Sequence, residues 1–260
     1  MSSQATSSET VSGRLTIIGL GPGDARFLTL DAQEALRAAQ DIIGYAPYVA
    51  RVPVTPGQRR IASDNRVEIA RAEEALRLAA SGRRVAVVSG GDPGIFAMAA
   101  AVLEAVDNGD PAWRALDIEI LPGISAMQAA AARLGAPLGH DFCVISLSDN
   151  LKPWSVIETR LELAARADFV MAFYNPASRA RPQRIHDAFA LLRRALPEDR
   201  LVVFAKSVGR AEEDIAITTL GRADPSVVDM STLVLIGASG TKLVARGDAP
   251  PFVYTSRKAP

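Results

Sequence analysis

Three short glycine loops hold the residues best suited to chemistry in this sequence. They are Gly19-Leu20-Gly21-Pro22-Gly23-Asp24, Gly90-Gly91-Asp92-Pro93-Gly94 and Pro122-Gly123-Ile124-Ser125. Glycine lets a ligand lie against bare backbone, and a carboxylate such as Asp92 can accept hydrogen bonds from a cationic or hydroxylated group. Each loop follows a short apolar run, and ligands of open α/β sheets sit at the carboxyl ends of the strands. We therefore expect the three loops to converge on one binding site.

Residue spacing argues against a dinucleotide site or a phosphate loop in the glycine-rich segments. The first loop has Asp24 where the dinucleotide fingerprint G-x-G-x-x-G needs its third glycine, and Pro22 stiffens the turn. Asp41, at about the right distance, precedes its apolar run instead of ending it. The segment Gly237 to Lys242 has the wrong order for a phosphate loop and is interpreted as a surface turn. From the residues alone, the second loop is equally compatible with a sharp strand-to-helix connection capped by Asp92.

Composition excludes several classes of protein. The chain has 260 residues, of which 48% are hydrophobic, and 29 basic residues balance 29 acidic ones, which disfavours a nucleic-acid binder. No apolar run is long enough to span a membrane, so we expect a cytoplasmic protein. A single cysteine, Cys143, excludes an internal disulfide and a Cys-ligated iron–sulfur cluster, and it is interpreted as a small buried residue. The abundance of arginine reflects either a compositional bias or a site for carboxylates.

The elements that must position the loops follow an α/β rhythm. Apolar runs at 15–18, 85–89 and 118–121 predict strands, and 28–36, 68–80 and 126–133 predict helices. This order indicates a mainly parallel sheet in an N-terminal domain over 14–138, preceded by a flexible tail over 1–13. A C-terminal α/β domain over 139–260 is expected to hold a mixed sheet, with a cleft between the domains. Its predicted strands are 142–147, 169–173 and 201–205, followed by a hairpin of 215–220 with 232–236.

Taken together, the three loops resemble those of the tetrapyrrole methylase superfamily, two-domain enzymes that use S-adenosylmethionine in cobalamin and sirohaem synthesis. Further segments are similar to the members that methylate carbon 17 of precorrin-3B and contract the ring to give precorrin-4. These segments are Ile43 to Val49, Ile145 to Asp149, Pro153-Trp154, Ala167 to Pro176 and Phe252 to Thr255. Asn150 and Lys152 depart from the leucine and threonine expected there.

The resemblance implies a set of contacts to S-adenosylmethionine, with no metal or iron–sulfur cluster. By position, the residues that would contact this methyl donor are Pro22, Gly90, Gly91, Asp92, Ile95, Ser125, Ala126, Phe173 and Val208. Asp92 would accept hydrogen bonds from the amino or ribose groups, and Ile95 and Phe173 would offer apolar surface to the adenosine. Phe173 is also compatible with ordinary strand core. Val208 stands where relatives have a glycine.

The implied reaction has two parts with different needs. Methyl transfer needs alignment, whereas contraction requires a tertiary alcohol to lose its proton, for which a general base is useful. Asp149 and His140, which flank one predicted strand, are candidates for the base, although each also fits a loop cap or surface group. Arg179, Arg181 and Arg184 are candidates to bind the substrate carboxylates, or else form a solvated helix start. The resemblance also implies a homodimer, and the balanced charge and the lack of a long apolar run lead us to expect no nucleic-acid or membrane partner.

Alternative functions remain open on sequence alone. The nearest is the cobalt-containing version of the same step, followed by another precorrin methyltransferase. A non-catalytic tetrapyrrole carrier is an alternative from a different class.

Overall fold

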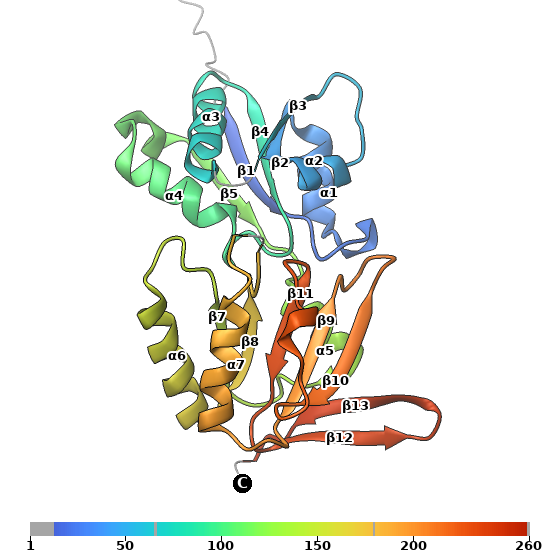
Figure 1. Ribbon diagram of the computed structural model, residues 1–260. Helices are drawn as coiled ribbons and strands as arrows, with labels where there is room; N and C mark the ends of the chain where they lie inside the picture. The colour runs from blue at the N-terminus through green and yellow to red at the C-terminus, as the bar shows by residue number, and fades with distance from the viewer. Residues whose placement is uncertain (1–12, 65–66, 179, 259–260) are drawn as a thin grey trace, which may run out of the picture. The chain divides into compact units, whose positions relative to one another are not determined.

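The computed structural model describes residues 13–64, 67–178 and 180–258, so most of the expected tail lies outside it. The chain divides into two compact units, Met1–Ser125 and Ala126–Pro260. Both units are α/β, as the sequence predicted (Figure 1). No helix among the described residues is long and apolar enough to cross a membrane.

The first unit is built on a parallel sheet whose strand order is β3-β2-β4-β1-β5. This confirms the prediction of a mainly parallel N-terminal sheet. Two of its strands, β2 and β3, were not predicted, and Asp41 begins β2 instead of ending a strand. The strands are β1 (Arg14–Gly19), β2 (Asp41–Tyr45), β3 (Arg59–Ser63), β4 (Arg84–Ser89) and β5 (Asp117–Leu121).

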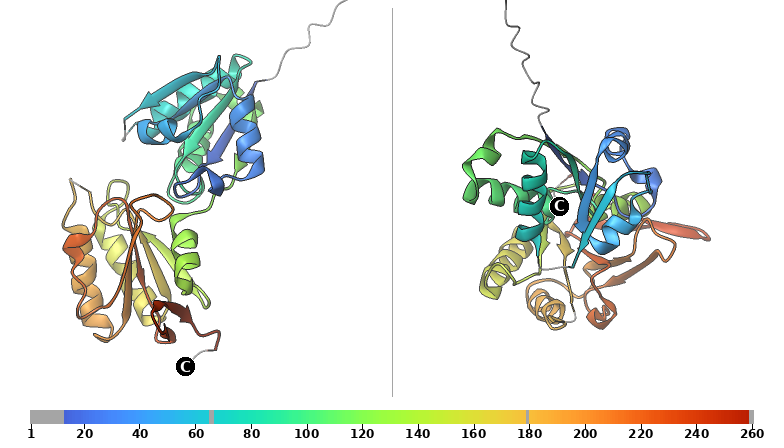
Figure 2. Two further views of the ribbon diagram at one scale, coloured as in Figure 1. Left: turned by 90° about the vertical axis from the view of Figure 1, so that its right-hand side faces the viewer. Right: turned by 90° about the horizontal axis from the view of Figure 1, so that it is seen from above.

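Helices cover both faces of this sheet (Figure 2). Leu15 and Ile17 of β1 point toward α3 and α4, whereas Ile18 contributes to the core under α1 and α2. The alternation follows from the two-residue period of a strand, with both faces apolar because both are covered. The helices are α1 (Leu30–Ala38), α2 (Ala46–Arg51), α3 (Glu68–Ala80) and α4 (Met98–Asn108), with 3-10 turns η1 (Ala25–Phe27) and η2 (Pro111–Ala115).

The second unit contains a mixed sheet in the order β10-β9-β11-β8-β7, which confirms the second fold prediction. Only β7 and β8 run parallel to each other, and the remaining neighbours are antiparallel. The predicted hairpin of β10 with β11 is wrong, because both strands pair with β9 from opposite sides. The strands are β7 (Phe142–Ser146), β8 (Val170–Tyr174), β9 (Leu201–Lys206), β10 (Asp214–Thr219) and β11 (Thr232–Ile236).

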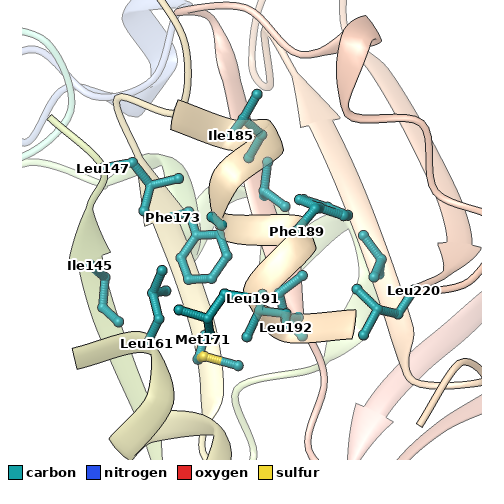
Figure 3. Close-up of a cluster of buried hydrophobic side chains, with 14 of the residues drawn as sticks. Ile145, Leu147, Leu161, Met171, Phe173, Ile185, Phe189, Leu191, Leu192 and Leu220 are labelled. Atoms are coloured by element: carbon teal, nitrogen blue, oxygen red, sulfur yellow. The ribbon is translucent and has the colours of Figure 1, made fainter. Parts of the chain in front are cut away.

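The core of the second unit lies between this sheet and two helices, α6 (Trp154–Arg166) and α7 (Arg184–Ala195). Figure 3 shows Phe173 of β8 enclosed by side chains of the sheet and of both helices. The 3-10 turn η3 (Pro225–Val227) lies in the long connection from β10 to β11.

A small second sheet fixes the position of the unit boundary. It joins β12 (Thr241–Arg246), β13 (Ala249–Thr255) and β6 (Gly135–Ala136), and β6 follows α5 (Ala126–Leu134) directly. The hydroxyl of Thr255 also donates a 2.5 Å hydrogen bond to the Pro137 carbonyl. These contacts attach α5 and β6 to the C-terminal half, so the division falls at Ser125 and Ala126, earlier than the expected 138/139. The segment Gly237 to Gly240 turns between β11 and β12.

Candidate active site

The three glycine loops follow β1, β4 and β5, which are adjacent in the parallel sheet of the first unit. Their backbones are in direct contact. The Gly21 N–H donates to the Gly91 carbonyl at 3.1 Å, and the Gly91 N–H donates to the Gly21 carbonyl at 2.9 Å. The first and second loops therefore form one hydrogen-bonded structure beyond the ends of their strands.

Glycine is required where the third loop meets the other two. A Cβ atom added to Gly123 would lie 2.2 Å from the Gly91 carbonyl oxygen. A Cβ atom added to Gly19 would lie 2.7 Å from both that oxygen and the Gly123 nitrogen. No side chain fits at these two positions, so part of the glycine content serves loop-to-loop packing.

Asp92 joins the second loop to the third. One carboxylate oxygen accepts the Gly94 N–H at 2.8 Å, and the other accepts the Gly123 N–H at 3.0 Å. The capping interpretation of Asp92 is thus part of its role. An ionised carboxylate has about four acceptor positions, so capacity remains for a ligand. Its predicted contact with the methyl donor stays a prediction.

The other predicted donor contacts of the first unit lie at the same edge of the sheet. Pro22 and Ser125 are buried, and Ile95 is half-buried. Gly90 packs against Tyr48, whose ring would be 2.7 Å from an added Cβ atom. The absence of a side chain at Gly90 is therefore explained by Tyr48, whereas the left-handed φ of 66° at Gly21 and 65° at Gly91 suits glycine for conformational reasons.

One edge of the mixed sheet in the second unit collects several of the remaining candidates. In the parallel pair β7 and β8, Ser146 pairs with Tyr174 at the carboxyl ends of both strands. Strand β11 runs antiparallel to β8 and β9, and its first residue, Thr232, pairs with Lys206 at the end of β9. The carboxyl ends of β7, β8 and β9 therefore lie at this one edge. Asp149 lies in the loop after β7, Arg181 in the loop after β8 and Val208 in the loop after β9.

Asp149 is held by two arginines. Its carboxylate receives Arg184 Nε at 2.7 Å and Nη2 at 2.6 Å, and Arg181 Nη1 lies 3.4 Å away. Burial alone would raise the pKa of Asp149, but the hydrogen bonds from Arg184 and the charges of both arginines hold it below its ordinary value. Asp149 is therefore ionised at neutral pH and is a weak base in this arrangement.

Arg184 is more fully engaged than Arg181. Besides Asp149 it contacts Asp187 at 3.1 Å, and its guanidinium lies 4.8 Å from the centre of the Trp154 ring. Lys152 lies in the same loop as Asp149, and its ammonium donates to the Ser148 carbonyl at 3.2 Å. Burial and the charges of Arg160 and Arg181 lower the pKa of Lys152.

Comparison with known proteins assigns the chain to a family. A model of the tetrapyrrole (corrin/porphyrin) methylases matches residues 14–224. A precorrin-3B C(17)-methyltransferase of a Sinorhizobium species is 53% identical over 95% of this chain and 97% of its own length. The chain belongs to the tetrapyrrole methylases. A methylase of this family acts on a tetrapyrrole and takes its methyl group from S-adenosylmethionine.

Two further proteins are similar to this methylase over most of their length. The crystal structure of the methyltransferase CobJ matches with a TM-score of 0.89 and 49% identity, covering 94% of this chain and 100% of that one. A probable cobalt-factor III C(17)-methyltransferase of Salmonella typhimurium is 44% identical over 87% of this chain and 93% of its own length.

Two predicted contacts of the methylase are buried within the second unit. Phe173 has no exposed surface, because its ring is enclosed by the core (Figure 3). The ring therefore lies in the core, as the alternative interpretation held, and the predicted contact of Phe173 with the donor stays a prediction. Val208 is 6% exposed and lies between Ser207 and Gly209, both of which have a positive φ. Ala126 begins α5 and is half-buried.

The two candidates for the general base do not lie together. His140 precedes β7, whereas Asp149 follows it, so they occupy opposite ends of one strand. The His140 Nδ1 atom is 3.8 Å from the carboxylate of Asp141. Since Arg181, Arg184 and Val208 lie beyond the carboxyl ends of the strands, Asp149 is the better placed of the two.

Of the three arginines predicted to bind the substrate carboxylates, the structure brings two together. Arg179 lies outside the described residues, and Arg181 and Arg184 both contact Asp149. Their availability to a substrate therefore depends on that carboxylate. Sequence reasoning gave no role to Lys152 or to the Trp154 ring under Arg184, although Lys152 stands in the loop after a predicted strand and Trp154 begins the helix that follows.

The described residues contain no group of three or more histidine, cysteine, aspartate or glutamate side chains arranged to hold a metal ion. Cys143 is half-buried, and burial raises the pKa of its thiol to about 11. The thiol is therefore protonated at neutral pH, which suits the packing role expected for it.

Proposed function

We propose that this methylase transfers a methyl group from S-adenosylmethionine to carbon 17 of precorrin-3B and contracts the macrocycle to give precorrin-4, in cobalamin biosynthesis. The observation that carries the proposal is the 53% identity to a precorrin-3B C(17)-methyltransferase over nearly the whole of both chains. The contact among the three glycine loops supports the proposal, because it brings together the residues expected to bind the donor.

Methyl transfer requires little acid–base chemistry from the chain. The bond between the sulfonium and its methyl group breaks with the electron pair left on sulfur, and an electron-rich ring carbon supplies the pair for the new bond. The task of the chain is to hold donor and carbon at near-attack distance, which can contribute about 7–11 kcal/mol to lowering a barrier. Glycine loops that fix one another through the Gly21–Gly91 bridge and Asp92 suit this task.

The substrate carboxylates are proposed to bind Lys152, Arg181 and Arg184 at the carboxyl edge of the second unit. Asp149 pairs with Arg181 and Arg184, and Asp187 pairs with Arg184, while Lys152 lies in the same loop as Asp149. The two carboxylates do not balance the three positive charges of Lys152, Arg181 and Arg184. The remaining positive charge attracts anionic groups. Asp149 orients both guanidinium groups in this arrangement.

For the ring contraction we propose Asp149 as the base, with His140 as the alternative. While Arg184 holds Asp149 its basicity is low. A substrate carboxylate that competes for Arg181 and Arg184 would weaken those ion pairs and raise the pKa of Asp149 again. As the alcohol proton passes to the Asp149 carboxylate, the electron pair of the O–H bond forms a carbonyl and the bond from the alcohol carbon to the migrating carbon breaks. The migrating carbon keeps that bonding pair and uses it to bond the adjacent ring carbon, which gives up a pair to its own leaving group.

The cobalt-containing version of the step is the second candidate, since a probable cobalt-factor III relative is 44% identical. The deciding experiment incubates the protein with metal-free or cobalt-bearing tetrapyrrole and labelled S-adenosylmethionine, followed by mass analysis of the product. We expect turnover of the metal-free substrate to a methylated, contracted product. Preferred turnover of the cobalt form would establish the second candidate, and binding without methyl incorporation would indicate a carrier.

We also propose a homodimer, supported by the exposed apolar side chains of the β12–β13 hairpin. Leu243, Val244 and Phe252 are 47%, 42% and 44% exposed, respectively. Apolar residues in one exposed strand pair are typical of an interface, and closed two-fold dimers are the commonest soluble oligomers.

A further inference from the structure

Arg51, the last residue of α2, makes an unusual set of contacts with the first glycine loop. A single nitrogen, Nη2, donates to the carbonyl oxygens of Leu20 at 2.9 Å, Gly21 at 2.9 Å and Gly23 at 3.0 Å. The loop is therefore wrapped around the guanidinium. Three carbonyl dipoles that point to one place repel each other unless a cation lies among them, so this loop conformation depends on the charge of Arg51.

The same loop conformation forms the Gly21–Gly91 bridge. The Gly21 carbonyl oxygen accepts hydrogen bonds from both Arg51 Nη2 and the Gly91 N–H. The Gly21 N–H in turn donates to the Gly91 carbonyl. Its φ of 66° is in the left-handed region, which a free loop would leave readily. A change at Arg51 should therefore be transmitted to the second loop through this bridge.

The helix that carries Arg51 is itself fixed from two directions. Arg60 Nη2 donates to the carbonyls of Val49 and, at 2.9 Å, Val52 at the end of α2. On another side of α2, the Tyr48 ring packs against Gly90 of the second loop. This short helix thus contacts two glycine loops, through Arg51 and through Tyr48.

We propose that Arg51 is a positioning residue for the methyl donor, which acts by holding the first glycine loop in its binding conformation before the donor arrives. The inference rests on the proposed function, because it takes these loops as the donor site. Pre-organisation of a loop raises affinity by removing the entropy cost of ordering it on binding.

The test replaces Arg51 with Met, which keeps the apolar stem and removes every donor, and measures binding of S-adenosylhomocysteine by titration calorimetry. Binding is measured at a temperature where the variant is fully folded. We expect the dissociation constant to rise about tenfold or more. In turnover, the KM for S-adenosylmethionine should rise while the KM for the tetrapyrrole stays within twofold, on the order of the error of such measurements. A general loss of stability would not separate the two constants in this way.

Arg84→Met is the matched control. Arg84 also donates to a backbone carbonyl, that of Ala38 at 2.9 Å, but it begins β4, at the opposite end of the sheet from the loops. We expect unchanged donor affinity in this variant. Arg51→Lys restores a cation without the planar guanidinium, and its affinity should lie between those of the native protein and Arg51→Met.

An Arg51→Met protein that is folded and binds S-adenosylhomocysteine like the native one would overturn the proposal. If Arg51→Met does not fold, Arg51→Gln takes its place, because it keeps an N–H donor but removes the charge, and native-like donor binding in that variant overturns the proposal. A native protein that does not bind S-adenosylhomocysteine would instead contradict the proposed function, so the two failures are distinguishable.

Discussion

The carboxylate of Asp92 accepts the backbone N–H of Gly123 at 3.0 Å across 31 residues of sequence. This hydrogen bond connects the loop after β4 to the loop after β5, which are on either side of the loop after β1. The side chain with the clearest predicted role in donor binding is therefore also a structural link between two loops. A test of its function must separate these two roles.

Replacing Asp92 separates them in two steps. Asp92→Ala removes both acceptor oxygens, so we expect it to abolish most of the rise in melting temperature that S-adenosylhomocysteine produces by binding the native state. Asp92→Asn keeps one acceptor oxygen and should retain part of the rise. The measurement is a thermal melt with and without ligand. An unchanged ligand-induced rise in Asp92→Ala would remove Asp92 from the site.

A methyl group at Gly123 should disrupt the meeting point of the loops. The added Cβ of Gly123→Ala would lie 2.2 Å from the Gly91 carbonyl oxygen, which forces the loops apart. We expect loss of S-adenosylhomocysteine binding by calorimetry and a destabilisation of about 1–3 kcal/mol, the usual range for overpacking. Gly240→Ala is the control, since its nearest neighbour would be 3.7 Å away. Native-like ligand binding in Gly123→Ala would contradict the packing described for these loops.

The two halves of the proposed reaction should be separable at Asp149. Asp149→Asn keeps the size of the side chain but removes the basic carboxylate. We expect a methylated product whose contraction is slowed by about 10²-fold or more, with normal donor binding. His140→Gln is the companion variant, and its position at the other end of β7 predicts normal contraction. Mass analysis of the products distinguishes them. Normal contraction rates in both variants would show that neither side chain is the base.

The buried carboxylate of Asp41 should make stability depend on acid pH. Burial works to raise its pKa, but hydrogen bonds from Arg83 and Arg59 outweigh burial and hold the pKa below the ordinary 3.8. A lowered folded-state pKa gives stabilisation that is complete above the unfolded-state value and is lost as the pH falls through the folded-state value. Asp41→Asn should therefore lower the free energy of unfolding at pH 7 by about 1–3 kcal/mol and flatten its decline below about pH 4.

Denaturant unfolding at a series of pH values measures this effect. The control is Asp117→Asn, because the Asp117 side chain is 56% exposed in its pair with Arg14. We expect a change below about 1 kcal/mol there, as for other exposed ion pairs. Equal pH profiles for native protein and Asp41→Asn would refute the assignment.

The proposed dimer predicts a mass in solution of twice the 27.5 kDa chain. Phe252→Lys places a charge among the exposed apolar residues of the β12–β13 hairpin, and light scattering at micromolar concentration should then report a monomer. Val227→Lys is the control, since Val227 is 57% exposed on η3, away from the hairpin strands. A monomeric native protein would refute the dimer, and a dimeric Phe252→Lys would move the interface elsewhere.

Local sequence pattern predicted those helices and strands whose residues show the composition and apolar spacing typical of their type. The helix expected at 68–80 is α3 with the same bounds, and the apolar run at 85–89 lies within β4. Strand β3 was missed because its sequence, Arg59 to Ser63, is mostly polar and half-exposed at the edge of the sheet. Propensity alone does not detect such a strand, whose pairing partner supplies its stability.

The site was predicted less completely for a different reason. Glycine loops after strands are visible in sequence, but the contacts of Arg51 with the first loop and of Arg184 with Asp149 join residues about thirty positions apart. No local pattern specifies such pairs. Phe173 shows the converse limit, because an aromatic residue in an apolar strand has the same appearance whether its ring faces a ligand or the core.

The stacking of Arg184 on Trp154 gives the protein an intrinsic optical reporter. The chain has two tryptophans, and the other, Trp113, is buried in η2 of the first unit. Indole emission is sensitive to a nearby cation, so Trp154 should register any ligand that draws Arg184 away from Asp149. A Trp113→Phe protein would carry this reporter alone, and the arrival of a polycarboxylate at Arg184 could be followed in real time without any label.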